Sequence, residues 1–143
     1  MTIYKNFDPG RISLTWNGVA IQGVGPSTFV KCVRNEDAFK QVVGAQGDVV
    51  DVRNRNRSGV VTFTILDASP SNDSLTQLAL QDEINGLGVG ALMIKDLNGT
   101  TLVKCANARI KKFPDVEFGA DGGTNEWAIQ CAELEFFVGG SAV

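Results

Sequence analysis

One stretch near the middle of the chain constrains the fold more than any other, because it joins a strong strand pattern to the clearest helix pattern. Ser58–Leu66 alternates β-branched and aromatic residues, and both of its faces are suited to contact neighbours. Pro70 and the polar residues around it end this strand and can cap a helix. The helix is predicted over Asp73–Asn85, and Gly86 follows where a left-handed residue often ends a helix.

The predicted helix carries two apolar stripes. At about 100° per residue, Leu75, Leu78 and Ala79 fall on one side, whereas Leu80 and Ile84 fall on the other. A helix that lies on the sheet of a monomer needs only one such stripe. The second stripe therefore predicts a second cover, which is either an extra loop of the same subunit or a neighbouring subunit. In the second case, Leu80 and Ile84 form an outer helix interface.

The rest of the chain has the pattern of short strands joined by turns. The predicted strands include Arg11–Trp16, Ser27–Arg34, Ala91–Lys95, Thr100–Cys105 and Glu126–Val138. Asn-Gly corners mark two hairpins. The parity of apolar residues changes midway through the last strand, which indicates a bulge or a strand that serves two surfaces. About eight or nine strands and one helix predict a mainly β fold, a β-sandwich or open barrel with one outer α-helix, in one domain spanning residues 1–143.

Residues 35–56, between the predicted strands Ser27–Arg34 and Ser58–Leu66, are predicted to form a long arm. Its first half, Glu36–Val43, reads as a short helix or an irregular strand, and Asp48–Arg53 reads as a returning strand. Gly44–Gly47 is the predicted apex, and the candidate contact residues at this end of the arm, which we call the tip, are Val42, Val43, Gly44, Ala45, Gln46 and Gly47. Valines beside a glycine-rich apex are unusual for a free loop, so we interpret the arm as a docking element for another chain. A hairpin edge and a lid are the alternatives.

The residue types argue against catalysis. The chain has no histidine, which removes the commonest general base and metal ligand. Cys32, Cys105 and Cys131 lack metal-ligand spacing and are predicted to be reduced, buried thiols. The glycines of Gly86–Gly90 follow a helix and precede a strand, the reverse of a nucleotide-binding loop. We therefore predict no catalytic residue, no cofactor site and no metal site.

The charge pattern argues against a nucleic-acid-binding protein. The net charge is −3 and the pI is about 4.9, so no general basic field attracts phosphate. Basic residues gather in two places, at Arg53, Arg55 and Arg57 and again at Arg109, Lys111 and Lys112. We interpret them as a solvated rim or as inter-subunit salt-bridge partners. The start of the chain lacks a signal-peptide pattern and no apolar run could cross a bilayer, so a soluble protein without a membrane partner is expected.

Three long motifs resemble one known family. They are NFDPGRISL (Asn6–Leu14), VRNEDAFKQVVGAQGDVVDVRNRNRSGVVTFTILDASPSND (Val33–Asp73) and WAIQCAELEFFVGG (Trp127–Gly140). Over nearly its whole length, the chain resembles the tail tube proteins of contractile-tailed, myovirus-type bacteriophages. These motifs are structural rather than chemical, so they identify a family better than a mechanism.

The resemblance implies a virion protein that assembles, in the host cytoplasm, into stacked hexameric rings. In such a tube the arm reaches the neighbouring ring, the helix lies outside and a contractile sheath surrounds the subunits. The implied partners are other copies, the tail sheath protein, baseplate or tail-initiator and tail-terminator proteins. Tape measure protein and genomic DNA would pass through the lumen without specific binding. An acidic lumen would prevent phosphate binding, and the candidate lining residues are Asp67, Asp96, Glu133 and Glu135.

Two other functions remain open at this point. The first is the inner tube of a phage-derived injection machine, a tailocin or a type VI-like apparatus. The second is a monomeric β-sandwich binding module, for example one that recognises a carbohydrate. Such a module would need exposed aromatic residues on loops, whereas Trp16 and Trp127 lie in strand patterns.

Overall fold

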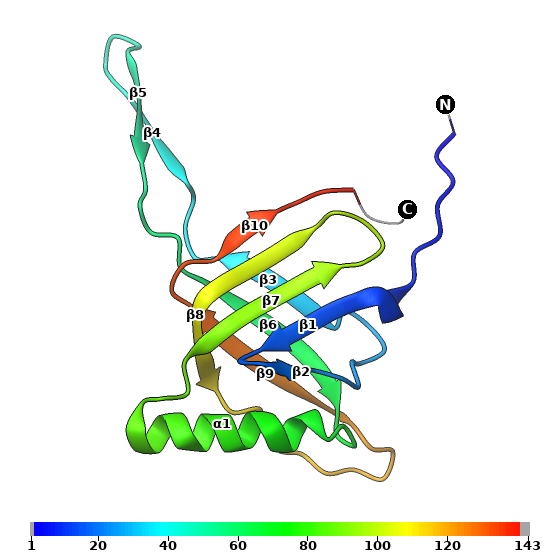
Figure 1. Cartoon of the computed structure of the whole chain (residues 1–143). Helices are drawn as coiled ribbons and strands as arrows, with labels where there is room; N and C mark the ends of the chain where they lie inside the picture. The colour runs from blue at the N-terminus through cyan, green and yellow to red at the C-terminus, as the bar shows by residue number, and fades with distance from the viewer. Residues whose placement is uncertain (1, 141–143) are drawn as a thin grey trace.

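The fold of the computed structural model is mainly β, with one large sheet, one helix and one separate hairpin (Figure 1). The structure describes residues 2–140. Residues 1 and 141–143, which belong to the predicted domain, lie outside the described part. A 3-10 turn (Pro9–Arg11) precedes the first strand. The elements are β1 (Ile12–Trp16), β2 (Val19–Ala20), β3 (Val30–Arg34), β4 (Phe39–Val43), β5 (Val49–Arg53), β6 (Gly59–Leu66), α1 (Ser71–Asn85), β7 (Gly90–Asp96), β8 (Leu102–Lys112), β9 (Thr124–Cys131) and β10 (Glu135–Phe137).

The large sheet is antiparallel and has the order β2-β1-β7-β8-β9-β6-β3. No pairing joins β2 to β3 among the described strands, so the sheet is an open one and not a closed barrel. β10 lies beside the first part of β8, while β9 pairs with its last part. The predicted strand Glu126–Val138 is therefore two strands, and the parity change falls at the break between them, Ala132–Leu134.

The strand predicted at the centre is β6, and its alternation places one face in the core. Val61, Phe63 and Ile65 are fully buried, whereas the threonines between them are half-buried. β6 pairs with β9 over its whole length, and Phe63 lies opposite Trp127. This burial confirms the face that the sequence pattern assigned to the core.

Two buried tryptophans connect the layers and have hydrogen-bonded indole groups. Trp16 Nε1 donates to the carbonyl oxygen of Ala108 at 3.1 Å, which ties β1 to β8. Trp127 Nε1 donates to Asn72 Oδ1 at 3.0 Å, which ties β9 to the first turn of α1. Each indole thus buries a large apolar area without leaving its N–H unsatisfied.

The helix begins two residues before the predicted start at Asp73 and ends where predicted. Pro70 already has a helical φ of −66°, so the first turn starts at Ser71. Ser71 Oγ also accepts a hydrogen bond from the backbone N–H of Gln22 at 2.9 Å, which anchors this turn to the chain after β2. Gly86 has a φ of 71° and its N–H donates to the carbonyl oxygen of Asp82, as expected of a C-terminal cap.

The turn predictions are confirmed, and one helix alternative is wrong. Asn17 and Gly18 both have positive φ, 51° and 79°, which is the two-residue corner expected between β1 and β2. The second Asn-Gly corner joins β7 to β8. Glu36–Val43 contains β4 and no helix, because its β-branched end pairs with valines of β5.

The two apolar stripes of α1 should differ in their effect on stability. Leu75 is fully buried, so Leu75→Ala should lower the free energy of unfolding by about 2–5 kcal/mol. Leu80 is 47% exposed, and Leu80→Ala should change it by about 0.5 kcal/mol or less. Urea unfolding of both variants at low protein concentration makes the comparison. An equal loss in the two variants would place Leu80 in the core of the subunit.

Candidate assembly surfaces

The arm stands away from the rest of the molecule. β4 and β5 pair only with each other, and every residue of both strands is exposed. The arm projects from one pole of the sheet, while α1 lies at the opposite pole (Figure 1). The structure therefore places the predicted tip residues, Val42–Gly47, together at the end farthest from the body.

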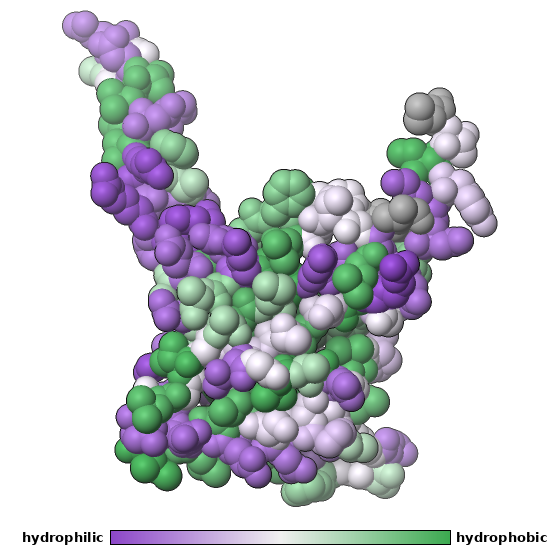
Figure 2. Space-filling model, viewed as in Figure 1, coloured by the Kyte–Doolittle hydropathy of each residue, from purple (hydrophilic) through white to green (hydrophobic). Residues whose placement is uncertain are grey.

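Both faces of the arm are apolar toward the tip. One face carries Phe39, Gln41, Val43, Val49, Asp51 and Arg53, and the other carries Lys40, Val42, Val50 and Val52. The valines are 46–61% exposed, and Figure 2 shows hydrophobic side chains along the arm. A two-stranded hairpin is marginally stable by itself, and exposed apolar patches commonly mark interaction sites. Such an arm is suited to insertion between two surfaces.

The base of the arm is polar and held by asparagine side chains. Asn54 Nδ2 donates to Glu36 Oε2 at 2.7 Å, and hydrogen bonds from Asn54 and Asn56 lower the pKa of Glu36. Asn56 Oδ1 accepts hydrogen bonds from the backbone N–H and the hydroxyl of Ser58. These side-chain bonds connect the two strands of the arm at its base and the segment that leads into β6.

The outer side of α1 is a second uncovered surface. Leu80 is 47% exposed and Ile84 is 84% exposed, and Leu87 just beyond the helix is 70% exposed. Among the described residues, no loop of the same subunit covers this stripe. The sequence left two possible covers for this stripe, a loop of the same subunit or a neighbouring subunit. The first of these, a loop from residues 2–140 of the same subunit, is therefore wrong.

The predicted lumen acids do not form one cluster. Asp67 follows the last residue of β6, whereas Glu133 lies two residues after Cys131, which pairs with the first residue of β6. The eight residues of β6 span about 25 Å, so these acids lie at opposite ends of the sheet. The structure thus brings Glu133 and Glu135 together and leaves Asp67 apart.

Glu133 and Glu135 already have basic partners in the subunit. Arg57 Nη1 lies 2.7 Å from Glu133 Oε1 and Arg57 Nη2 lies 3.9 Å from Glu135 Oε1. Lys104 Nζ lies 3.7 Å from Glu135 Oε2. Two cations therefore balance the two carboxylates, and the group adds no net negative charge to its surface. These side chains are about half exposed, so their ion pairs contribute little to stability.

Asp96 must be removed from the set of exposed acids. It is only 7% exposed, and its Oδ1 accepts a hydrogen bond from the backbone N–H of Asn98 at 2.9 Å. Asn98 in turn donates from Nδ2 to the carbonyl oxygen of Asp8 at 2.8 Å. Asp96 therefore organises the turn between β7 and β8 and is not placed to line a solvated channel.

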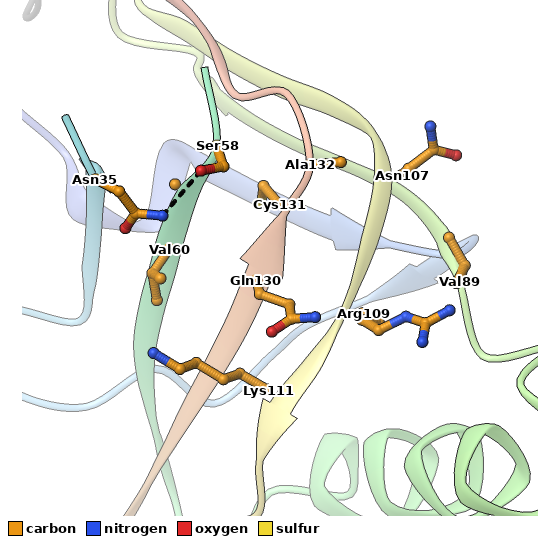
Figure 3. Close-up of a pocket in the computed structure, with 11 residues that line it drawn as sticks. Asn35, Ser58, Val60, Val89, Asn107, Arg109, Lys111, Gln130, Cys131 and Ala132 are labelled. Atoms are coloured by element: carbon orange, nitrogen blue, oxygen red, sulfur yellow. Dashed lines mark hydrogen bonds between the residues drawn. The ribbon is translucent and has the colours of Figure 1, made fainter. Parts of the chain in front are cut away.

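A polar groove on the outer face of the sheet was not predicted from the sequence. It has a volume of about 480 Å³ and crosses β6, β8 and β9 (Figure 3). We call it the β8–β9 groove, and its lining includes Asn35, Ser58, Val60, Val89, Asn107, Arg109, Lys111, Gln130, Cys131 and Ala132. The only signal in the sequence was the alternation of Arg109 and Lys111, which places both on one face of β8.

The groove contains two cations and no carboxylate among its lining residues. Arg109 Nε lies 3.8 Å from Asp82 Oδ2 of α1, at the edge of ion-pair range. Lys111 is exposed and has no ion pair within the part of the chain that the structure describes. The groove can therefore accept negatively charged or hydrogen-bond-accepting groups, with apolar contacts from Val60 and Val89.

The three thiols are free and unsuited to chemistry. Cys105 and Cys131 are buried and Cys32 is partly buried. Burial raises the pKa of Cys131 from 9.0 to about 12 and that of Cys32 to about 11, so both remain protonated and weakly nucleophilic at neutral pH.

Within residues 2–140 the structure groups no three metal-ligating side chains. No helix in that range is long and apolar enough to cross a membrane.

Comparisons with known proteins agree on a structural role. Residues 14–139 match the model of the family described as bacteriophage PhiTE tail tube protein. The structural protein ORF10 of Pseudomonas phage KPP10 is 27% identical over 145 residues, covering 96% of this chain and 84% of that protein.

Solved structures with the same fold come from contractile injection systems. The sheath–tube complex of the extracellular contractile injection system PVC contains a chain with a TM-score of 0.64 and 13% identity, and the match covers 96% of this chain and 93% of that one. The sheath/tube terminator of PVC has a TM-score of 0.65 and 11% identity, with 96% and 100% covered. At these identities the likeness concerns the fold alone.

The buried thiols predict a loss of stability at high pH. Because the pKa of Cys131 is higher in the folded protein than in the unfolded chain, its contribution is complete below pH 9 and falls as the pH rises toward 12. The free energy of unfolding should therefore be lower at pH 10 than at pH 8 in urea titrations. Cys131→Ala should show a smaller decrease between the same two pH values. An identical decrease would exclude Cys131 as the titrating group.

Proposed function

The chain belongs to the bacteriophage PhiTE tail tube protein family, and we propose that it assembles into stacked hexameric rings that form the inner tube of a contractile tail. It is a structural tail protein of the virion and not an enzyme. The observation that carries the ring-stacking proposal is the arm, which exposes valines on both faces at the pole opposite α1. In a tube, the neighbouring ring would cover these valines.

The open edges of the sheet support assembly around the ring. β3 has no second partner strand among the described strands, and β2 is only two residues long. Unpaired strand edges are templates for pairing with another chain. Lateral contacts between such edges would turn the open sheets of several subunits into one continuous wall.

The other partners follow from the remaining surfaces and from the comparisons. The exposed stripe at Leu80 and Ile84 is assigned to the outside of the tube, where a neighbouring subunit or the tail sheath protein would cover it. The similarity to chains of a sheath–tube complex and of a sheath/tube terminator supports sheath and terminator partners. A baseplate or tail-initiator protein would start the tube, and assembly would take place in the host cytoplasm.

The lumen would carry tape measure protein and then genomic DNA without binding either specifically. The net charge of −3 supports this part of the proposal, because like charges repel phosphate. Of the acids predicted to line the lumen, Asp67 is exposed and has no ion pair in the described part of the chain, while Glu133 and Glu135 have basic partners. We therefore keep Asp67, Glu133 and Glu135 as lumen candidates and omit Asp96.

A tube in a phage-derived injection machine is the second candidate, because the similar solved structures come from such systems. The family match and the phage relative favour a virion. The monomeric binding module is not retained, because the family match supports a tail tube protein and both tryptophans are buried, although Phe118 is an exposed aromatic residue on a loop.

Electron microscopy of the purified protein over a concentration series, together with sedimentation velocity, tests the proposed assembly. Rings or hollow tubes of uniform width are expected. If the protein remains a monomer at high concentration even when the baseplate initiator is added, the proposal fails.

Charge at the arm tip should block stacking without unfolding the subunit. Val43 is 61% exposed, so Val43→Asp should leave the free energy of unfolding within about 0.5 kcal/mol of the parent. Tube yield should fall at least tenfold, because a buried, unpaired carboxylate costs more than one kcal/mol. Val116→Asp, at an exposed valine outside the arm, is the matched control. Normal tubes from Val43→Asp would exclude the tip from the contact between rings.

A further inference from the structure

We propose that the β8–β9 groove of one subunit receives the arm tip of a second copy of the chain. In this contact, an acid beside the tip, either Asp48 or Asp51, meets Lys111 of the groove, because alternation along the strand places these two acids on opposite faces of the hairpin. The inference rests on the proposed function and adds the surface on which the stacking arm binds.

The outer part of the arm, Gln41–Val52, carries acids as well as valines. It contains Asp48 and Asp51 and no basic residue, and Lys40 and Arg53 flank it on the side of the arm base. Both acids are exposed, and no ion pair involves them within the described part of the chain. The valines beside them are about half exposed. A receiving surface must therefore offer cations and apolar contacts together.

The groove has this combination. Its lining includes Arg109 and Lys111 and no carboxylate. Apolar groups at Val60, Val89 and Ala132 lie along the same groove and can contact the valines. Figure 3 shows Arg109 and Lys111 extending from β8 and Gln130 from β9. The charges of tip and groove are thus complementary, which favours this pairing over others that the surface permits.

The tip that fills the groove must belong to another subunit. Asn35 and Ser58 at the base of the arm line the groove and are joined by a hydrogen bond of 3.0 Å (Figure 3). β4 spans about 17 Å, and the arm points away from the sheet, so its own tip lies beyond reach. A contact between two different surfaces of identical subunits is heterologous and continues from copy to copy.

The polarity of the molecule fits this arrangement. β8 ends at Lys112 near the pole that carries α1, so Lys111 lies at the α1 end of the groove (Figures 1 and 3). The arm leaves from the opposite pole. When copies are stacked along the arm, each tip approaches the α1 pole of the next subunit and meets Lys111 first. Repetition of this contact produces a linear stack.

The groove suits an acidic protein segment better than nucleic acid. It holds only two cations, one of which already lies near Asp82, and the whole chain is acidic. Affinity for DNA depends on several phosphate contacts made by cations. The apolar groups in the groove match valines and have no counterpart in a phosphate backbone.

Carbodiimide cross-linking of the unmodified protein tests the contact, because it joins a lysine to a carboxylate only when they touch. Assembled protein made from equal parts of unlabelled and ¹⁵N-labelled subunits is digested and analysed by mass spectrometry. An inter-subunit link from Lys111 to Asp48 or Asp51 is expected. Tubes without this link would overturn the inference and leave the tube function intact. Absence of any assembly would overturn both.

Charge reversal provides an independent test with a matched control. Lys111→Glu should reduce assembly about tenfold or more, because like charges then face each other. Adding Asp48→Lys or Asp51→Lys to that variant should restore assembly in at least one combination, whereas Lys95→Glu, at an exposed lysine of β7, should have no effect. If neither combination restores assembly, the inference is wrong. It is also wrong if the parent binds a labelled DNA duplex and Lys111→Glu abolishes that binding.

Discussion

The pairing of β6 with β9 holds the strand that fixes where the arm and α1 lie relative to each other. Eight consecutive residue pairs, from Gly59–Cys131 to Leu66–Thr124, join these strands in one register. The arm enters β6 at its first residue, and α1 follows its last residue after a short turn. The arm and the outer stripe of α1 are therefore attached to opposite ends of one strand, about 25 Å apart.

This arrangement makes the subunit polar along β6. With the arm at one pole and the helix at the other, the arm of one subunit can contact the opposite pole of the next one, and this contact can repeat in the same direction. Contacts between unlike surfaces produce rings or linear stacks. The tail tube family to which the chain belongs is consistent with such a stack. The proposed stacking would also account for the exposed valines of the arm, because a neighbouring subunit would cover them.

Local patterns predicted the local structure well. The alternation in β6, the Asn17-Gly18 corner and the Gly86 cap each depend on a few adjacent residues, and all three are confirmed. The start of α1 was missed by two residues because Pro70 already has helical geometry. The pattern in Glu36–Val43 did not separate helix from strand, since the pairing partner of β4 lies in β5.

The candidate sites were less predictable because they depend on distant segments. Asp96 was predicted as an exposed acid, but in the folded turn it is buried and accepts a hydrogen bond from the backbone N–H of Asn98. The basic partners of Glu133 and Glu135 are Arg57 and Lys104, which lie on other strands or loops. The β8–β9 groove combines residues from separate parts of the chain, so no local motif describes it.

Amide hydrogen exchange in the arm before and after assembly tests most directly whether the arm holds neighbouring subunits together. In the subunit, the amides of Phe39–Val43 and Val49–Arg53 lie in an exposed two-stranded hairpin and should exchange within seconds to minutes. In assembled tubes they should be protected by at least 100-fold, because another copy covers both faces. Equal exchange in the two states would contradict the claim that the arm holds neighbouring subunits together.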